Sequence, residues 1–144
     1  MSDKKPPSPA ELEILQQLWA RGPLSVREVH DAIGETRPVV YTTVLKIMQL
    51  MFERGLLTRQ VDGRRHLYTA AVSESSTQDN LLDRFLDKAF SGSAGELVLR
   101  TLGKHQPSAD ELSRIREVLA QYDDQSADEV QEPTFKNPSN PAEQ

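Results

Sequence analysis

The chain has 144 residues, of which 37% are hydrophobic and 27% are charged, a composition that predicts a small folded core with extended or disordered parts. It contains no cysteine, which excludes disulfides, thiolate metal sites and a cysteine nucleophile, and favours a reducing, cytoplasmic location. No apolar run approaches the roughly 18 residues that span a bilayer, and the charged, proline-rich N-terminus is unlike a signal peptide, so we expect no membrane association.

The net charge of −5 is unevenly distributed along the chain. Residues 1–72 contain ten Lys and Arg against eight Asp and Glu, whereas residues 73–144 contain seven against fourteen. Within residues 36–68 the count is six basic against two acidic. Because charges act locally, over a Debye length of about 10 Å, this basic segment favours a phosphate-bearing partner. Ordinary scatter of surface charge is the alternative, and charge alone does not decide between them.

Three helices are predicted in the first 54 residues. Residues 8–11 and 25–28 both follow the capping-box pattern Ser-x-x-Glu, and apolar residues recur behind each at helical spacing until a glycine ends the helix. A third helix is predicted to begin near Pro38 and to run to Arg54. Its predicted inward face consists of Val40, Val44, Ile47, Met48 and Met51.

The spacing of apolar residues then changes from helical to alternating. Two alternating segments, 57–61 and 65–68, flank an Asp-Gly turn, which predicts a β-hairpin with a basic tip. Three short helices followed by a basic hairpin predict a winged helix-turn-helix domain at residues 8–72. In that fold the third helix enters the major groove of DNA and the hairpin, or wing, contacts the adjacent backbone.

The second half predicts helices only, so the predicted fold class is mainly α with one small β-hairpin. Three short amphipathic helices cannot bury their apolar faces alone, and pairing with a second copy would cover them. Residues 73–122 are therefore predicted to be a helical dimerisation domain, and the acidic residues 123–144 a disordered tail. The predicted dimer contacts are Leu81, Leu82, Phe85, Leu86, Phe90, Leu97, Val98, Leu102, Leu112, Ile115 and Leu119.

The polar side of the third helix is the candidate surface for reading DNA. Threonine and glutamine can bond base edges, and lysine can reach guanine or phosphate. The predicted contacts are Arg37, Tyr41, Thr42, Thr43, Lys46 and Gln49 in or before the helix, with Arg64 and Arg65 in the wing. Gln49 ranks below the others in the helix, because base contacts usually come from its N-terminal part. Arg37 and the two wing arginines are expected at phosphates, and the wing arginines also suit the minor groove. An ordinary exposed helix face is the alternative.

No arrangement of residues suggests catalysis. The three histidines, His30, His66 and His105, lack ligand partners at metal spacing and are expected to serve surface or packing roles. No glycine-rich phosphate loop, nucleophile elbow or zinc motif is present. We therefore predict that the protein is not an enzyme and needs no metal or other cofactor.

Three segments together resemble the penicillinase-repressor family, of the BlaI/MecI/CopY type. These are residues 39–45 (VVYTTVL), 53–57 (ERGLL) and 63–68 (GRRHLY). The opening segment, residues 12–29, fits the same pattern. The likeness runs from about residue 8 to residue 122 and is strongest through residue 70.

The resemblance implies a dimeric repressor whose N-terminal winged helix binds a palindromic operator in double-stranded DNA. It assigns operator contact to Thr42, Thr43 and Lys46, and backbone contact to Arg64 and Arg65. In the antibiotic-resistance branch it also implies release by a regulatory protease that cleaves an Asn-Phe pair. Residues 100–101 occupy that region here and read Arg-Thr, so we expect no cleavage at this bond.

Two other departures from the family pattern concern release and recognition. The copper-sensing branch uses a C-terminal cysteine cluster, and the absence of cysteine excludes that route here. Leu50 stands where a basic residue is common in the third helix, which predicts a missing phosphate contact or an altered half-site preference.

Two other functions are open from the residues alone. One is a winged-helix protein-interaction module without specific DNA binding, in which the acidic C-terminal half binds a basic partner. The basic segment of the third helix and wing argues against it, because such a module has no need of that charge. The other is a MarR-like small-molecule sensor, and the absence of a long dimerisation helix before residue 8 argues against that fold.

Overall fold

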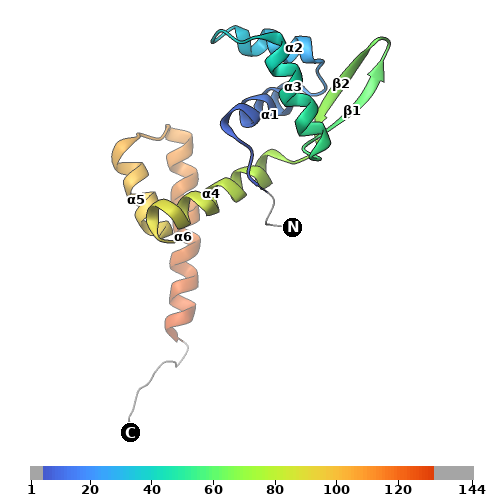
Figure 1. Ribbon diagram of the computed structural model, residues 1–144. Coiled ribbons are helices and arrows are strands. Elements are labelled where there is room, and N and C mark those ends of the chain that lie inside the picture. The colour runs from blue at the N-terminus through green and yellow to red at the C-terminus, as the bar shows by residue number, and fades with distance from the viewer. Residues whose placement is uncertain (1–4, 132–144) are drawn as a thin grey trace. The chain divides into compact units, whose positions relative to one another are not determined.

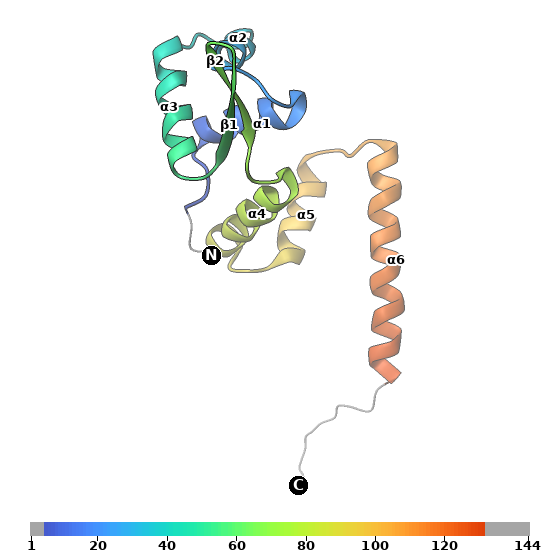
Figure 2. The same cartoon turned by 90° about the vertical axis from the view of Figure 1, so that its right-hand side faces the viewer.

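The computed structural model describes residues 5–131, which divide into two compact units between Ser93 and Ala94 (Figures 1 and 2). The described part of the first unit contains helices α1 to α4 and a two-stranded sheet, and that of the second contains α5 and α6. The predicted fold class, mainly α with one β-hairpin, is confirmed. The division between the units falls after α4, beyond the predicted domain boundary at residue 72.

Helices α1 (Pro9–Arg21) and α2 (Val26–Gly34) begin at the predicted capping boxes. At the start of α1 the amide of Glu11 donates to the Ser8 hydroxyl at 3.2 Å, and the amide of Ser8 donates to the Glu11 carboxylate at 3.0 Å. The same two bonds form at the start of α2. Gly22 ends α1 with φ of 84°, a backbone conformation that favours glycine.

Helix α3 (Tyr41–Glu53) begins three residues later than predicted. Val40 is extended and precedes the helix, and its carbonyl accepts the first helical hydrogen bonds, from the amides of Thr43 and Val44 at 3.1 and 3.2 Å. As the residue before the first turn, Val40 lies outside the helical repeat. It is 63% exposed, so its predicted place in the core is wrong. The buried side of α3 consists of Val44, Met48 and Met51, with Ile47 half-buried.

The predicted hairpin forms from β1 (Leu57–Asp62) and β2 (Arg65–Ala70), which pair antiparallel. The last residue of β1 lies opposite the first residue of β2, which leaves a turn of two residues, Gly63 and Arg64. Gly63 adopts φ of 67°, as tight hairpin turns require at this position. Arg64 therefore occupies the tip of the wing.

The first three helices and the hairpin share one apolar core. Tyr68 brings β2 into it: the side chain is buried, and the backbone pairs with Leu24 through hydrogen bonds of 2.8 and 3.0 Å. The half-buried Trp19 donates its indole N–H to the carbonyl of Val72 at 2.9 Å, which ties the chain leaving the hairpin to α1. The other large, fully buried residues are Ile14, Leu15, Val29, Val44, Met48, Met51 and Leu57.

Helix α4 (Glu74–Phe90) follows the hairpin and is largely exposed. The hydroxyl of Ser73 caps it by accepting the amide of Ser76 at 3.1 Å. Thr77 is its one buried residue, and the predicted apolar stripe stays open, with Leu82 and Phe85 about half exposed.

The second unit contains α5 (Ala94–Lys104) and α6 (Ala109–Gln131). A third capping box precedes α6: the amide of Glu111 donates to the Ser108 hydroxyl at 3.1 Å, and the amide of Ser108 donates to the Glu111 carboxylate at 2.9 Å. Helix α6 continues nine residues beyond the predicted boundary at residue 122, so the start of the predicted tail, 123–131, is helical. Backbone hydrogen bonds between residues four apart hold this stretch as a helix, and its acidic composition did not indicate such bonds. Residues 132–144 lie outside the described residues.

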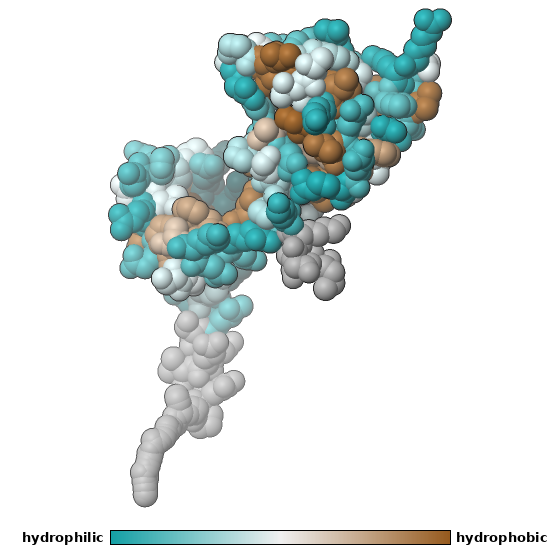
Figure 3. All heavy atoms as spheres, in the orientation of Figure 1, coloured by the Kyte–Doolittle hydropathy of each residue, from teal (hydrophilic) through white to brown (hydrophobic). Residues whose placement is uncertain are grey.

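None of the described side chains of α5 and α6 is buried. Apolar surface is visible in Figure 3 (brown), and the described part of the second unit exposes several large apolar residues. These residues are Val98, Leu99, Leu102, Val118, Leu119 and Tyr122. The described residues of this unit therefore form no buried core.

Candidate nucleic-acid interface

The outward side of α3 is polar and exposed. The exposed residues predicted to read DNA are Thr42, Thr43, Lys46 and Gln49, and they lie on the side of the helix opposite Val44 and Met48. Leu50, the departure from the family pattern, lies on this outward side and is 46% exposed. We refer to Thr42, Thr43, Lys46, Gln49 and Arg64 of the wing tip as the α3–wing surface.

Tyr41, also predicted to contact DNA, packs against residues of α2. The guanidinium carbon of Arg27 lies 4.4 Å from the centre of its ring, and the ring of His30 meets it edge-on at 5.7 Å. The side chain is half-buried, so the first turn of α3 is held against α2. Sequence reasoning did not find this role for Arg27, because the cation and the ring are fourteen positions apart.

The N-terminus of α3 lacks a capping side chain, since Val40 precedes the helix and makes no side-chain hydrogen bond to it. Helices α1, α2 and α4, in contrast, all begin with a serine hydroxyl that accepts a first-turn amide. Uncapped amides at the start of a helix, where the helix dipole is positive, attract anions such as phosphate.

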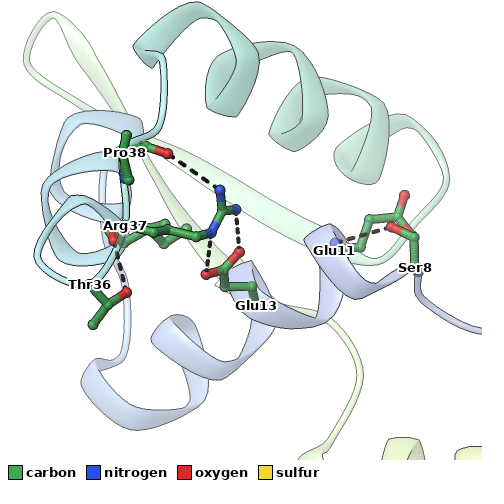
Figure 4. Close-up of polar contacts among 7 residues, drawn as sticks. Ser8, Glu11, Glu13, Thr36, Arg37 and Pro38 are labelled. Carbon is green, nitrogen blue, oxygen red and sulfur yellow. Dashed lines mark hydrogen bonds and ion pairs between the residues drawn. The ribbon is translucent and has the colours of Figure 1, made fainter.

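Arg37, predicted to contact phosphate, forms an ion pair with Glu13 of α1 (Figure 4). Its NH2 donates to Glu13 Oε1 at 2.6 Å and its Nε donates to Glu13 Oε2 at 3.1 Å, so one edge of the guanidinium is fully engaged. A third bond, at 3.4 Å, joins NH1 to the carbonyl of Pro38. The hydrogen bonds from Arg37 lower the pKa of Glu13, and the same contact raises the pKa of Arg37.

The two wing arginines differ in their surroundings. Arg65 donates from Nε and NH2 to the carboxylate of Asp62, both at 3.2 Å, and its NH1 lies 3.9 Å from Glu28 of α2. Arg64 makes no ion pair or side-chain hydrogen bond with any residue that the structure describes, and Lys46 shares this property. The sequence ranked Arg64 and Arg65 together, whereas the fold separates them.

The wing tip and the start of α3 lie toward the same end of the first unit (Figures 1 and 2). Two contacts already described explain this placement. Arg65 of the wing approaches Glu28 in the first turn of α2, and the neighbouring Arg27 lies over Tyr41 in the first turn of α3. The first turn of α2 therefore contacts both the wing and the first turn of α3.

A second arginine that the sequence left unassigned supports the base of the wing. The guanidinium carbon of Arg59 in β1 lies 4.0 Å from the ring centre of Phe52 in α3, and its NH1 donates to the Tyr68 hydroxyl at 3.4 Å. Arg59 is exposed, but alternation along β1 places it on the same side of the hairpin as buried Leu57, and this spacing is the sequence signal for its contact with the domain.

The described residues, 5–131, contain no group of three or more His, Asp or Glu placed to hold a metal ion. His30 contacts Asp31 and the carbonyl of Val39, both at 3.0 Å. Within the same range no helix combines the length and the apolar character needed to cross a bilayer.

Comparison with known proteins finds relatives that are bacterial repressors or transcriptional regulators. The family described as penicillinase repressor matches residues 7–121. A penicillinase repressor of Bacillus licheniformis is 24% identical over 115 residues, which cover 80% of this chain and 90% of that protein. The transcriptional regulator BlaI of Mycobacterium tuberculosis is 28% identical over 115 residues, which cover 78% of this chain and 82% of that protein. The solution structure of the DNA-binding domain of the repressor BlaI also matches, with 28% identity and a TM-score of 0.45. This match covers 50% of the present chain and 90% of the BlaI domain.

The family match includes α1 to α5 and the hairpin and continues into α6, so it extends over both units rather than over the winged helix alone. The chain therefore belongs to the penicillinase repressor family, a family of DNA-binding winged-helix transcriptional repressors and not of enzymes.

Proposed function

We propose that this protein is a sequence-specific transcriptional repressor that binds a palindromic operator as a homodimer and blocks a promoter by occupying it. The observation that carries the proposal is the α3–wing surface. Polar side chains able to bond base edges stand exposed on α3. Lys46 and Arg64, which pair with no carboxylate in the described part of the chain, belong to the same surface. Five arginines of the winged helix, in contrast, contact carboxylates or aromatic rings: Arg27, Arg37, Arg54, Arg59 and Arg65.

In the proposed complex α3 lies in the major groove, where Thr42, Thr43 and Lys46 bond base edges. The uncapped amides of the first turn and Arg64 contact phosphates on either side of the groove. A two-fold dimer places two such helices in successive major grooves, roughly 34 Å apart, so the operator repeats as an inverted sequence.

The homodimer is supported by the apolar surface of the C-terminal helices. Leu119 is 51% exposed and Leu99 is 70% exposed, and α5 and α6 bury no described side chain of their own. Isolated helices of this length with open apolar faces gain stability by packing against another copy. We place the protein in the cytoplasm, where a bacterial-type operator is accessible to it.

Regulated cleavage at residues 100–101 does not form part of the proposal. Both residues lie inside α5, where the Thr101 hydroxyl donates to the carbonyl of Leu97 at 2.7 Å. A helical segment must unfold before a protease can bind it in extended form.

The testing experiment is a gel-shift titration of the full chain on the DNA upstream of its own gene and on random DNA, each at two salt concentrations. The proposal predicts tight, selective binding as a complex of dimer size, with an affinity that falls steeply as salt rises, because bound cations release counterions from phosphate. Equal, weak binding to both DNAs would mean that the operator lies elsewhere. An absence of binding even at low salt would contradict the proposal and favour the protein-interaction module.

A further inference from the structure

We propose that Glu13 of α1 is a positioning residue for DNA reading: it holds Arg37 so that the start of the recognition helix is fixed on α1, and Arg37 serves this ion pair rather than a phosphate. The inference rests on the proposed DNA-binding function. It concerns Glu13, which the sequence did not single out, and gives Arg37 a role different from the predicted one.

The geometry of the pair is the first support. The two bonds between the guanidinium and the carboxylate, at 2.6 and 3.1 Å, fix the plane and direction of the Arg37 side chain (Figure 4). A two-point contact of this kind restrains orientation as well as distance. The third bond, to Pro38, connects the same guanidinium to the segment that leads into α3.

The segment between Arg37 and α3 transmits this restraint. Only Pro38, Val39 and Val40 separate Arg37 from Tyr41, and the proline ring restricts its own backbone. The carbonyl of Val39 accepts from His30 at 3.0 Å, and that of Val40 accepts the first amides of α3. Because this short segment has little freedom, the position of Arg37 determines where α3 begins.

A second ion pair at the other end of α3 points to the same role. Arg54, the residue directly after α3, donates to Glu11 of α1 at 2.5 Å. Glu11 and Glu13 are two residues apart on one helix, so α1 holds both ends of α3. Two attachment points resist a tilt of the helix that a single one would allow.

The charges also argue against a phosphate contact by Arg37. Glu13 occupies one of the two edges of the guanidinium that can bind a phosphate in two-point fashion, and the NH1 of the other edge bonds the carbonyl of Pro38. The Glu13 carboxylate beside it repels an approaching phosphate, whereas no carboxylate contacts Lys46 or Arg64 among the described residues.

The experiment compares four forms of the full chain: wild type, Glu13→Gln, Arg37→Gln, and the charge-swapped variant with Glu13→Arg and Arg37→Glu. For each, affinities for the operator and for random DNA are measured at several salt concentrations. The charge-swapped variant keeps the net charge of the wild type and can rebuild the pair, but it places no cation at position 37. Trp19 fluorescence during urea unfolding shows that each variant is folded.

We expect both single substitutions to lower the ratio of operator to random-DNA affinity by about two- to fivefold, the range that a partly exposed ion pair supports. The charge swap is expected to restore this ratio, and the salt slope is expected to stay constant. In the absence of DNA, hydrogen exchange at the Thr43 and Val44 amides is expected to rise in the single variants and to recover in the swap.

Other outcomes would overturn the inference. If Arg37→Gln and the charge swap both weakened binding to the two DNAs equally and reduced the salt slope by about 0.9, Arg37 would be a phosphate ligand. Unchanged ratios in all variants would also contradict it. If the charge swap failed to fold, the double variant with Glu13→Gln and Arg37→Gln replaces it, and additive effects of the two substitutions would exclude coupling through the pair. Failure of the wild type to bind any DNA would instead contradict the proposed function, and the exchange data would still test the positioning role.

Discussion

At the scale of single residues, the basic side chains of the winged helix differ in whether they have partners. An exposed cation with a nearby carboxylate must share or give up that partner to bind phosphate, whereas an unpaired one loses nothing. The paired or stacked arginines are Arg27, Arg37, Arg54, Arg59 and Arg65, and the unpaired cations of the α3–wing surface are Lys46 and Arg64. DNA affinity should therefore depend unequally on side chains of the same type.

Arg64→Ala is expected to weaken binding to the operator and to random DNA by the same factor. The side chain stands at the wing tip without a partner among residues 5–131, so its loss removes one phosphate contact and lowers the salt slope by about 0.9. Fluorescence-anisotropy titrations over a range of salt measure both quantities. Arg65→Ala is the matched comparison and should lower the slope less, because Asp62 already neutralises much of that charge. Equal slopes for the two variants would contradict this assignment.

Lys46→Ala is expected to change discrimination among operators rather than general affinity. Lys46 is exposed at the centre of the outward side of α3, where a lost base contact costs about 1–3 kcal/mol. Competition titrations with operators altered at single base pairs would locate the affected position. Lys104→Ala, which removes the same charge from α5, provides the control. A uniform loss on specific and random DNA would show that Lys46 binds phosphate instead.

At the scale of elements, the helix starts rest on reciprocal bonds between serine and glutamate. The Glu28 carboxylate accepts from the Ser25 amide, and this hydrogen bond lowers the pKa of Glu28. Hydrogen bonds from Ser108 likewise lower the pKa of Glu111 at the start of α6. A carboxyl whose folded pKa is depressed stabilises the fold above its ordinary pKa of about 4.3, and this stabilisation is lost as pH falls through the folded value.

Glu28→Gln is therefore expected to reduce the fall in the free energy of unfolding at acidic pH. The wild-type free energy of unfolding should fall on acidification below about pH 4.3, and the variant, which has no carboxyl to protonate there, should lose less. Urea unfolding followed by Trp19 fluorescence at several pH values measures the difference. Glu35→Gln removes an exposed carboxylate that has no side-chain partner among the described residues, and it should leave the profile unchanged. Parallel profiles for wild type and Glu28→Gln would contradict the role of the cap.

At the scale of the whole molecule, the two units differ in how they are stabilised. The winged helix has a shared core, whereas α5 and α6 leave their apolar residues open. In the proposed complex a single winged helix would bind one half-site of the operator. Linking two winged helices in a dimer would raise the effective concentration of the second at its half-site. Dimerisation through the C-terminal helices would therefore determine operator affinity without contacting DNA.

Leu119→Asp is expected to dissociate the proposed dimer. Burial of a leucine is worth about 1.5–3 kcal/mol, so the dimer Kd should rise at least about tenfold, and operator affinity should fall while the winged helix stays folded. Analytical ultracentrifugation over a range of concentrations measures the first effect and gel shifts the second. Ser113→Asp adds the same charge on the other side of α6 and should preserve the dimer. A wild type that stays monomeric at all concentrations would refute the homodimer.

Much of the fold could be predicted from the sequence, because its signals are local. Capping boxes at residues 8–11, 25–28 and 108–111 indicate helix starts through bonds between residues three apart, and the alternation in β1 and β2 indicates the hairpin. The later start of α3 and the continuation of α6 to Gln131 were missed, because neither a capping side chain nor a strong apolar spacing marks those ends.

The sequence by itself therefore determined the order of the elements, the family and the set of candidate contacts, since each depends on neighbouring residues or short motifs. Only the tertiary structure decided which of these candidates are unpaired. Arg37 meets Glu13 across 24 positions of the chain, and Arg65 approaches Glu28 from a different element. Such pairings form when the core brings α1, α2 and the wing together, and no local spacing encodes them. The tertiary structure also distinguishes Lys46 and Arg64 from the paired arginines, because no carboxylate in the described part of the folded chain contacts them.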